Sequence, residues 1–196
     1  MRMRSDRTIG KVTLFAAALL AVAGAFACRQ EATPKPEERP LVVIANLQRH
    51  PILDAVEKGA VDALAEAGYR DGQTVRLLYR SADGDMQRVG TIAQEIAAQQ
   101  PALTVAISTP IAQAIVQKSK APVVFGALTD PVSAGVVASL AGSEAVTGTS
   151  DALPYDEQLR LIRRILPSAR RLGLLFNPGE VASQHAVTEL RRIAPG

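Results

Sequence analysis

The chain has 196 residues, a formal net charge of +3, one cysteine and two histidines. Residues 1–27 contain four basic residues and one acidic residue, so they account for the whole net charge and the rest is close to neutral. A neutral remainder has no basic surface for nucleic acid, and a single cysteine cannot form a disulfide within the chain.

The N-terminus has the layout of an export signal. Four basic residues precede an apolar run, Val12–Phe26. Small residues, Ala25 and Ala27, then lead directly to Cys28, as in a lipoprotein cleavage site. We expect residues 1–27 to be a lipoprotein signal peptide and Cys28 to become the lipidated first residue of an exported, membrane-anchored protein. The alternative is an uncleaved anchor or a buried first helix, but the run is shorter than the ~20 residues that a spanning helix needs.

Residues 28–40 are polar and contain three prolines without any periodicity. This composition is typical of a flexible tether between a membrane and a domain.

Strand-like and helix-like patterns then alternate. The predicted strands are Leu41–Ala45, Thr74–Tyr79, Leu103–Ile107, Val123–Ala127 and Val146–Thr149. Apolar stripes at helical spacing separate them, with Gly68 as a helix stop and Asp85 as a cap. Parallel strands need crossovers long enough to hold a helix, so the pattern predicts an α/β fold with a doubly wound parallel sheet.

Beyond Asp151 the pattern restarts. We expect a helix over Pro154–Leu166, a sixth strand over Leu172–Phe176 and a last helix over Val181–Ile193. One strand and two helices cannot close a second sheet by themselves. They are therefore predicted to be the start of a second α/β lobe.

Ligands of such sheets bind outside the carboxyl ends of the strands, so the loops there are the candidate sites. Thr109 and Pro110 follow the third strand, where Thr109 can cap a helix and the free N–H groups of its first turn favour a carboxylate. Asp130 precedes Pro131 after the fourth strand and can accept hydrogen bonds from a ligand ammonium group. Capping alone explains either residue equally well.

The remaining polar residues suggest no catalytic centre. The loops contain no phosphate-binding glycine motif, no GxSxG elbow and no His/Cys cluster, so we expect neither a cofactor nor a metal. His50 and His185 are interpreted as surface or rim residues, because neither has a nearby cysteine. The arginines between positions 160 and 171 are interpreted as a solvated face.

Six motifs in serial order carry a family resemblance. They are HPILDAVEKGAVDALAEAGYRDGQTV, the turn SADGD, AISTPIAQAI, PVVFGALTDPVSAGVV, VTGTSD and LGLLFNPGE. Together they resemble the substrate-binding proteins of an ABC transporter family associated with tryptophan and other aromatic amino acids. The resemblance implies a fold similar to the type I periplasmic binding proteins, in which two lobes close on a small ligand, and it implies ABC permease subunits as partners.

The resemblance also implies lobe boundaries and site residues. Residues 41–151 would be the first lobe, and residues 152–196 the crossover and part of a second lobe. The implied ligand-binding residues are His50, Ser108, Thr109, Asp130, Ser150, Asp151 and Asn177. A full second lobe needs on the order of 100 further residues, so we expect a truncated chain with weakened ligand binding.

Two other hypotheses stay open. The chain could be an exported α/β enzyme that uses Asp130, Asp151 or His50 as an acid or base. It could also be a truncated lipoprotein without ligand function.

Overall fold

The computed structural model describes residues 38–141, 143 and 145–194. The predicted signal peptide, Cys28 and the tether up to residue 37 lie outside this range. Within it, no helix is both long enough and apolar enough to cross a membrane.

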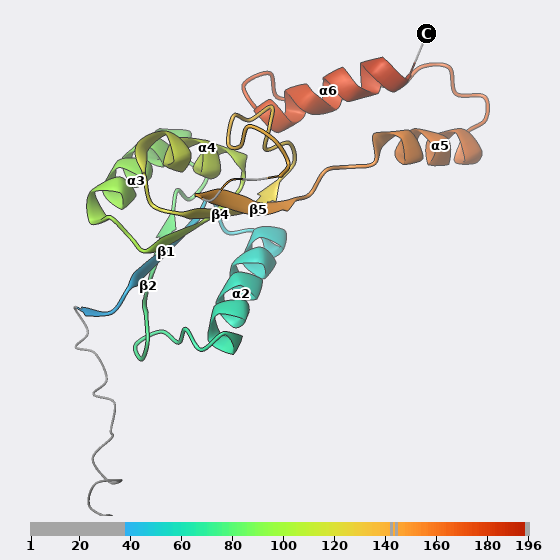
Figure 1. Ribbon diagram of the computed structural model, residues 1–196. Coiled ribbons are helices and arrows are strands. Elements are labelled where there is room, and N and C mark those ends of the chain that lie inside the picture. The colour runs from blue at the N-terminus through green and yellow to red at the C-terminus, as the bar shows by residue number, and fades with distance from the viewer. Residues whose placement is uncertain (1–37, 142, 144, 195–196) are drawn as a thin grey trace, which may run out of the picture. The chain divides into compact units, whose positions relative to one another are not determined.

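The described chain contains one sheet of five strands in the order β2-β1-β3-β4-β5, and every neighbouring pair is parallel (Figure 1). The strands are β1 (Leu41–Asn46), β2 (Arg76–Ser81), β3 (Leu103–Ile107), β4 (Val123–Leu128) and β5 (Val146–Ser150). All six residues of β1 are buried, whereas both edge strands are largely exposed or half-buried. This confirms the predicted parallel sheet, because a strand buried on both faces reads as a continuous apolar run.

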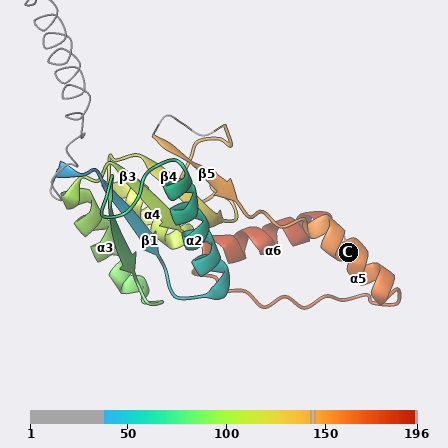
Figure 2. The same cartoon turned by 90° about the horizontal axis from the view of Figure 1, so that it is seen from below.

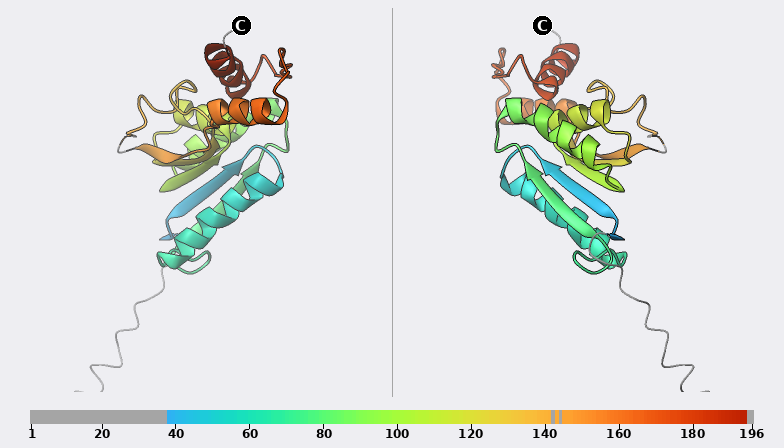
Figure 3. Two further views of the ribbon diagram at one scale, coloured as in Figure 1. Left: turned by 90° about the vertical axis from the view of Figure 1, so that its right-hand side faces the viewer. Right: turned by 90° about the vertical axis from the view of Figure 1, so that its left-hand side faces the viewer.

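Helices cover both faces of the sheet, as the doubly wound prediction requires (Figure 3). They are α2 (Pro51–Glu66), α3 (Met86–Gln99) and α4 (Thr109–Lys118), followed by α5 (Tyr155–Ile165) and α6 (Val181–Ile193). Helix α2 packs on one face, where Ile44 and Val105 meet Val56. Helices α3 and α4 pack on the other, where Val43 and Ala45 meet apolar residues of both helices. Successive residues of β1 thus point to opposite faces.

Two local signals are confirmed, and a third is shifted by one residue. Gly68 has a φ of 90° after α2, and the Asp85 carboxylate accepts a hydrogen bond of 2.8 Å from the Gln87 N–H at the start of α3. Thr109, however, is the first helical residue of α4 and not its cap. The cap is Ser108, with φ 88° and ψ 155°, and its side chain makes no capping bond.

Asp130 makes the hydrogen bonds of a helix cap, but no helix begins there in the described chain. Asp130 Oδ1 accepts hydrogen bonds from the Val132 and Ser133 N–H groups at 3.1 and 3.0 Å, as a cap does. The chain completes one turn and then leaves it at Gly135, which has a φ of 67°. A left-handed glycine at this point ends the helical hydrogen-bonding pattern.

The predicted sixth strand over Leu172–Phe176 is wrong, because this segment has no strand pairing and lies in the connection between α5 and α6 (Figure 2). Its side chains are exposed, Leu175 completely so. A strand needs a neighbour for its backbone N–H and C=O groups, and no other strand in the described chain pairs with this segment. The helices predicted on either side of it both form.

Candidate functional site

Parallel strands end at one edge of a sheet, and the polar residues singled out from the sequence gather at or just after these ends. Ser108 follows β3, Asp130 follows β4 by two residues, and Ser150 is the last residue of β5. His50 lies four residues after β1, at the start of α2. Asn177 lies in the connection before α6 and follows no strand of the described chain.

Ser108 combines a strained backbone with an unsatisfied hydroxyl. Its φ and ψ of 88° and 155° lie in a region that is essentially reserved for glycine. Only 8% of the residue is exposed, and its Oγ finds no hydrogen-bond partner among the described residues. The backbone is held in place, since the Ser108 N–H donates to the Gly126 carbonyl at 3.0 Å. The hydroxyl therefore stays at the N-terminus of α4 beside the buried Thr109.

Asn46, at the end of β1, is a candidate that sequence reasoning missed. It is 3% exposed, and its amide Nδ2 donates to Glu57 Oε2 at 3.5 Å. Its Oδ1 has no hydrogen-bond partner in the part of the chain that is described. In the sheet Asn46 is opposite Ile107, the residue before Ser108. A polar last residue in an otherwise apolar strand was the signal that could have found it.

Strand β4 bends just before the Asp130 loop. Its pairing with β5 is irregular between Phe125 and Leu128, and Ala127 has a φ of 51°. Gly126 leaves room for α2 at this point, because a Cβ on Gly126 would lie 2.7 Å from Val56 Cγ1. Bulges of this kind re-aim the chain at the edge of a sheet. Here the irregularity immediately precedes the loop that carries Asp130.

Asp130 is held by its own loop and by the last helix. Its Oδ2 lies 2.9 Å from Nδ1 of His185 in α6, and both side chains are half-buried. Burial alone would raise the pKa of this carboxyl, but hydrogen bonds from Ser133 and Val132 and the nearby His185 lower the pKa below its ordinary value. Asp130 is therefore a carboxylate at neutral pH.

His185 is thus more than a rim residue. Its ring also faces that of Tyr155, with the two centroids 6.2 Å apart. Tyr155 is buried, and this burial, together with the charges of Asp151 and Glu189, raises the pKa of its hydroxyl. No local pattern in the sequence connects residues 130, 155 and 185, because their contacts are long-range.

The other predicted site residues have structural partners. His50 caps α2, since its Nδ1 accepts from the Ile52 N–H at 3.3 Å. The Ser150 hydroxyl donates to the Thr129 carbonyl at 2.8 Å, and the Asp151 N–H donates to the Leu128 carbonyl at 3.3 Å. Asn177 Oδ1 accepts from the Gly179 N–H at 3.0 Å, so it stabilises an exposed turn. These bonds give each of the four residues a structural role.

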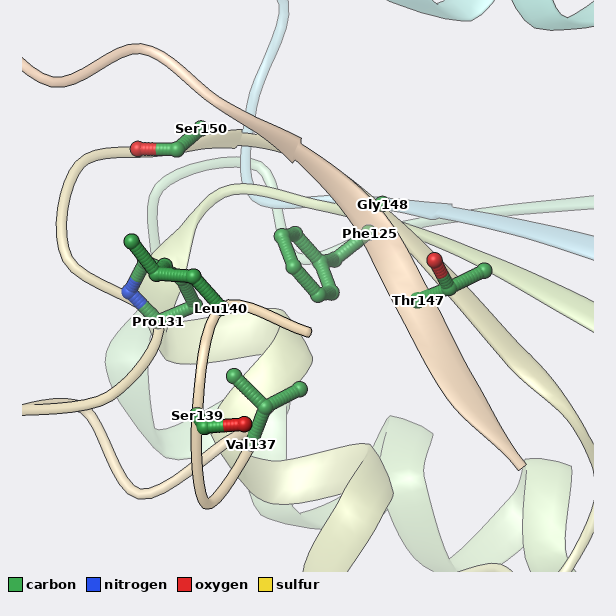
Figure 4. A pocket seen from close by; sticks show the side chains of 8 residues that line it. All are labelled: Phe125, Pro131, Val137, Ser139, Leu140, Thr147, Gly148 and Ser150. Atoms are coloured by element: carbon green, nitrogen blue, oxygen red, sulfur yellow. The ribbon is translucent and has the colours of Figure 1, made fainter. Parts of the chain in front are cut away.

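A cavity of about 160 Å³ lies between β5 and the loop that follows Asp130 (Figure 4). The Phe125 ring points into it from β4, and Thr147, Gly148 and Ser150 line it from β5. The loop contributes the remaining walls, which are Pro131, Val137, Ser139 and Leu140. The described residues contain no group of three or more His, Cys, Asp or Glu side chains that could hold a metal ion.

Comparison with known proteins places these features in context. Residues 41–196 match the family model for ABC transporter substrate binding proteins. The chain is similar to a tyrosine-binding protein of Clostridioides difficile strain R20291, with 39% identity over 153 residues, which cover 77% of this chain and 44% of that protein.

Two solved structures are also similar. One is an ABC domain in complex with L-Trp from Streptococcus pneumonia, with a TM-score of 0.74, 33% identity, and coverage of 80% of this chain and 54% of that one. The other is a conserved domain protein from Vibrio cholerae, with a TM-score of 0.75, 35% identity and the same coverage. The chain therefore spans about half the length of the relatives it matches.

Proposed function

Because this chain belongs to the ABC transporter substrate-binding protein family, we propose that its carboxyl sheet edge binds an amino acid for an ABC importer. The family is one of binding proteins and not of enzymes, which decides against the alternative of an exported enzyme. The edge contributes one wall of the binding cleft, and the amino acid is held by its charged ends.

The observation that carries this proposal is the pair of unsatisfied buried atoms at the ends of β1 and β3. Asn46 Oδ1 and Ser108 Oγ lack hydrogen-bond partners among the described residues, and they belong to neighbouring strands. Leaving a buried polar group unpaired costs about 1–3 kcal/mol. A ligand that offers hydrogen bonds at this edge recovers that cost.

The chemistry of the edge suits a zwitterion. The N-terminus of α4 presents unpaired N–H groups and a partial positive charge, which favour the ligand carboxylate beside Ser108 and Thr109. The ionised Asp130 and the amide oxygen of Asn46 are acceptors for the ammonium group. Since His185 contacts Asp130, the ammonium group binds by displacing or sharing this imidazole.

The relatives favour an aromatic amino acid. One is described as a tyrosine-binding protein, and another was solved in complex with L-Trp. The family works outside the cytoplasm. We further propose that Cys28 carries a lipid anchor and that the protein delivers its ligand to ABC permease subunits, for which the sequence around Cys28 and the family are the support.

Calorimetric titration of the purified chain with the common amino acids tests the proposal. We expect heat of binding with tyrosine or tryptophan, weaker binding by Asp130→Ala, and ligand recovered unchanged. Asp62→Ala is the matched control, because Asp62 is an exposed residue of α2 that pairs with Lys58. Absence of binding to every amino acid, or equal losses in the two variants, would contradict the proposal.

A further inference from the structure

We infer that Glu57 of α2 is a positioning residue of the ligand site, which turns the Asn46 amide so that its Oδ1 stays free as an acceptor for the ligand ammonium group. This inference rests on the proposed function. It names a residue that makes the site prefer ligands with an ammonium group, although Glu57 acts on them only through Asn46.

The main chain of Asn46 is fixed within the sheet. Asn46 is opposite Ser81 of β2 and Ile107 of β3, and its carbonyl accepts a hydrogen bond of 3.1 Å from the Ala82 N–H. The residue is almost completely buried. The freedom that remains is the orientation of the side-chain amide, whose oxygen and nitrogen exchange places when the amide turns over.

Glu57 decides between these two orientations. Its Oε2 lies 3.5 Å from Asn46 Nδ2, and an ionised carboxylate only accepts hydrogen bonds. If the amide turned over, two acceptor oxygens would face each other. Nδ2 is therefore held toward Glu57, and Oδ1 is directed away from it and has no hydrogen-bond partner among the described residues.

The other carboxylate oxygen of Glu57 is next to Arg49. Arg49 Nη1 lies 3.9 Å from Glu57 Oε1, and Arg49 Nε lies 3.4 Å from Asp54 Oδ1. Because Arg49 is largely exposed, these ion pairs contribute little to stability. A guanidinium only donates hydrogen bonds, however, so Arg49 determines that an acceptor atom of residue 57 faces it.

Glu57→Gln separates a positioning role from a purely structural one. The glutamine keeps one carbonyl oxygen, so a residue that only satisfies a buried amide tolerates the change. Arg49 attracts this oxygen, and the glutamine then turns its NH₂ group toward Asn46. The Asn46 amide turns over in response and offers a donor where the ammonium group needs an acceptor.

Calorimetric titration of the whole chain with L-tryptophan and with indole-3-propionate, which lacks the ammonium group, tests the inference. The ratio of the two affinities reports recognition of the ammonium group. Glu57→Gln should lower this ratio about tenfold or more, which is the scale of one hydrogen bond to a charged group. Glu66→Gln is the matched control at an exposed position of the same helix, and it should leave the ratio unchanged.

The same titrations in an Asn46→Leu background show whether Glu57 acts through Asn46. With the amide removed, Glu57→Gln should have no further effect on the ratio. An equal loss in both backgrounds would mean that the charge of Glu57 acts on the ligand directly, and it would overturn the inference.

One measurement needs no variant. In the unmodified chain, the Nδ2 protons of Asn46 should show NOEs to the side-chain protons of Glu57, and their absence would overturn the inference. An unchanged ratio in Glu57→Gln would also overturn it while leaving the proposed function intact. If the unmodified chain binds no amino acid, the proposed function and the inference are overturned together.

Discussion

Replacing Ser108 with glycine should stabilise the fold and weaken ligand binding. Serine at φ 88° and ψ 155° occupies a region that glycine reaches freely, and this strain costs on the order of 1–3 kcal/mol. The buried, unpaired hydroxyl of Ser108 costs about 1–3 kcal/mol more, and glycine removes both penalties.

Two opposing effects are smaller. Glycine makes the unfolded chain more flexible, which costs about 0.5–1 kcal/mol. A glycine cap is only a few tenths of a kcal/mol worse than serine, and Ser108 makes no side-chain capping bond that could be lost. The net effect is a gain of about 1–5 kcal/mol in the free energy of unfolding. Each kcal/mol corresponds to roughly 2–4 °C in Tm for a chain of this size.

Urea unfolding monitored by circular dichroism gives this free energy, with Ser108→Ala as the companion variant. Alanine removes the hydroxyl and keeps the strain, so its stability should lie between those of serine and glycine. Both variants should bind tyrosine or tryptophan more weakly than the unmodified chain. A Ser108→Gly protein whose free energy of unfolding is lower than that of the unmodified chain by about 1 kcal/mol or more would refute the reasoning about strain and the unpaired hydroxyl.

Three further outcomes follow from the sequence and structure. Thr109→Ala should weaken amino acid binding more than it lowers the free energy of unfolding, whereas Thr109→Ser should preserve both; equal losses from alanine would mean a structural role alone. Asp130→Ala should cost about 0.5–2 kcal/mol of stability at pH 7. The pKa of the Asp130 carboxyl is lower in the folded than in the unfolded chain, so the stability that the carboxylate contributes is complete above the unfolded pKa and is lost as the pH falls through the folded pKa. The free energies of unfolding of the unmodified chain and of Asp130→Ala should therefore converge in strong acid. A difference that stays constant with pH would argue against an ionised role. Cys28→Ser should release the protein from the membrane fraction or leave it unprocessed, and a variant that remains mature-sized and palmitate-labelled would show that Cys28 is not the anchor.

The five strands of the sheet were predictable because each can be recognised from the residues within it. The unbroken apolar run of β1 reflects burial on both faces, and Gly68 and Asp85 mark helix ends through bonds to residues next to them in the chain. The cap of α4 was misplaced by one residue. Thr109 directly precedes a proline and therefore resembles a helix cap more than Ser108 does. The unusual φ and ψ of Ser108 cannot be recognised from the residue types.

The remaining features depend on residues far apart in the chain. Leu172–Phe176 has the composition of a strand, yet without a pairing partner in the described chain it stays a connection. The contact of Asp130 with His185 joins a loop to a helix 55 positions later, and helical periodicity cannot reveal it. Asn46 was missed because it ends a strand that was assigned by its apolar residues.

The central claim is that the N-terminus of α4 and the Asp130 loop hold the two charged ends of an amino acid. The most direct measurement is a set of intermolecular NOEs between labelled L-tryptophan and the amide protons of the chain. We predict NOEs from the tryptophan Hα to amides at Thr109, Ile111 and Ala112 and in the Asp130 loop. Contacts confined to α5, α6 or the connection between them would contradict the account.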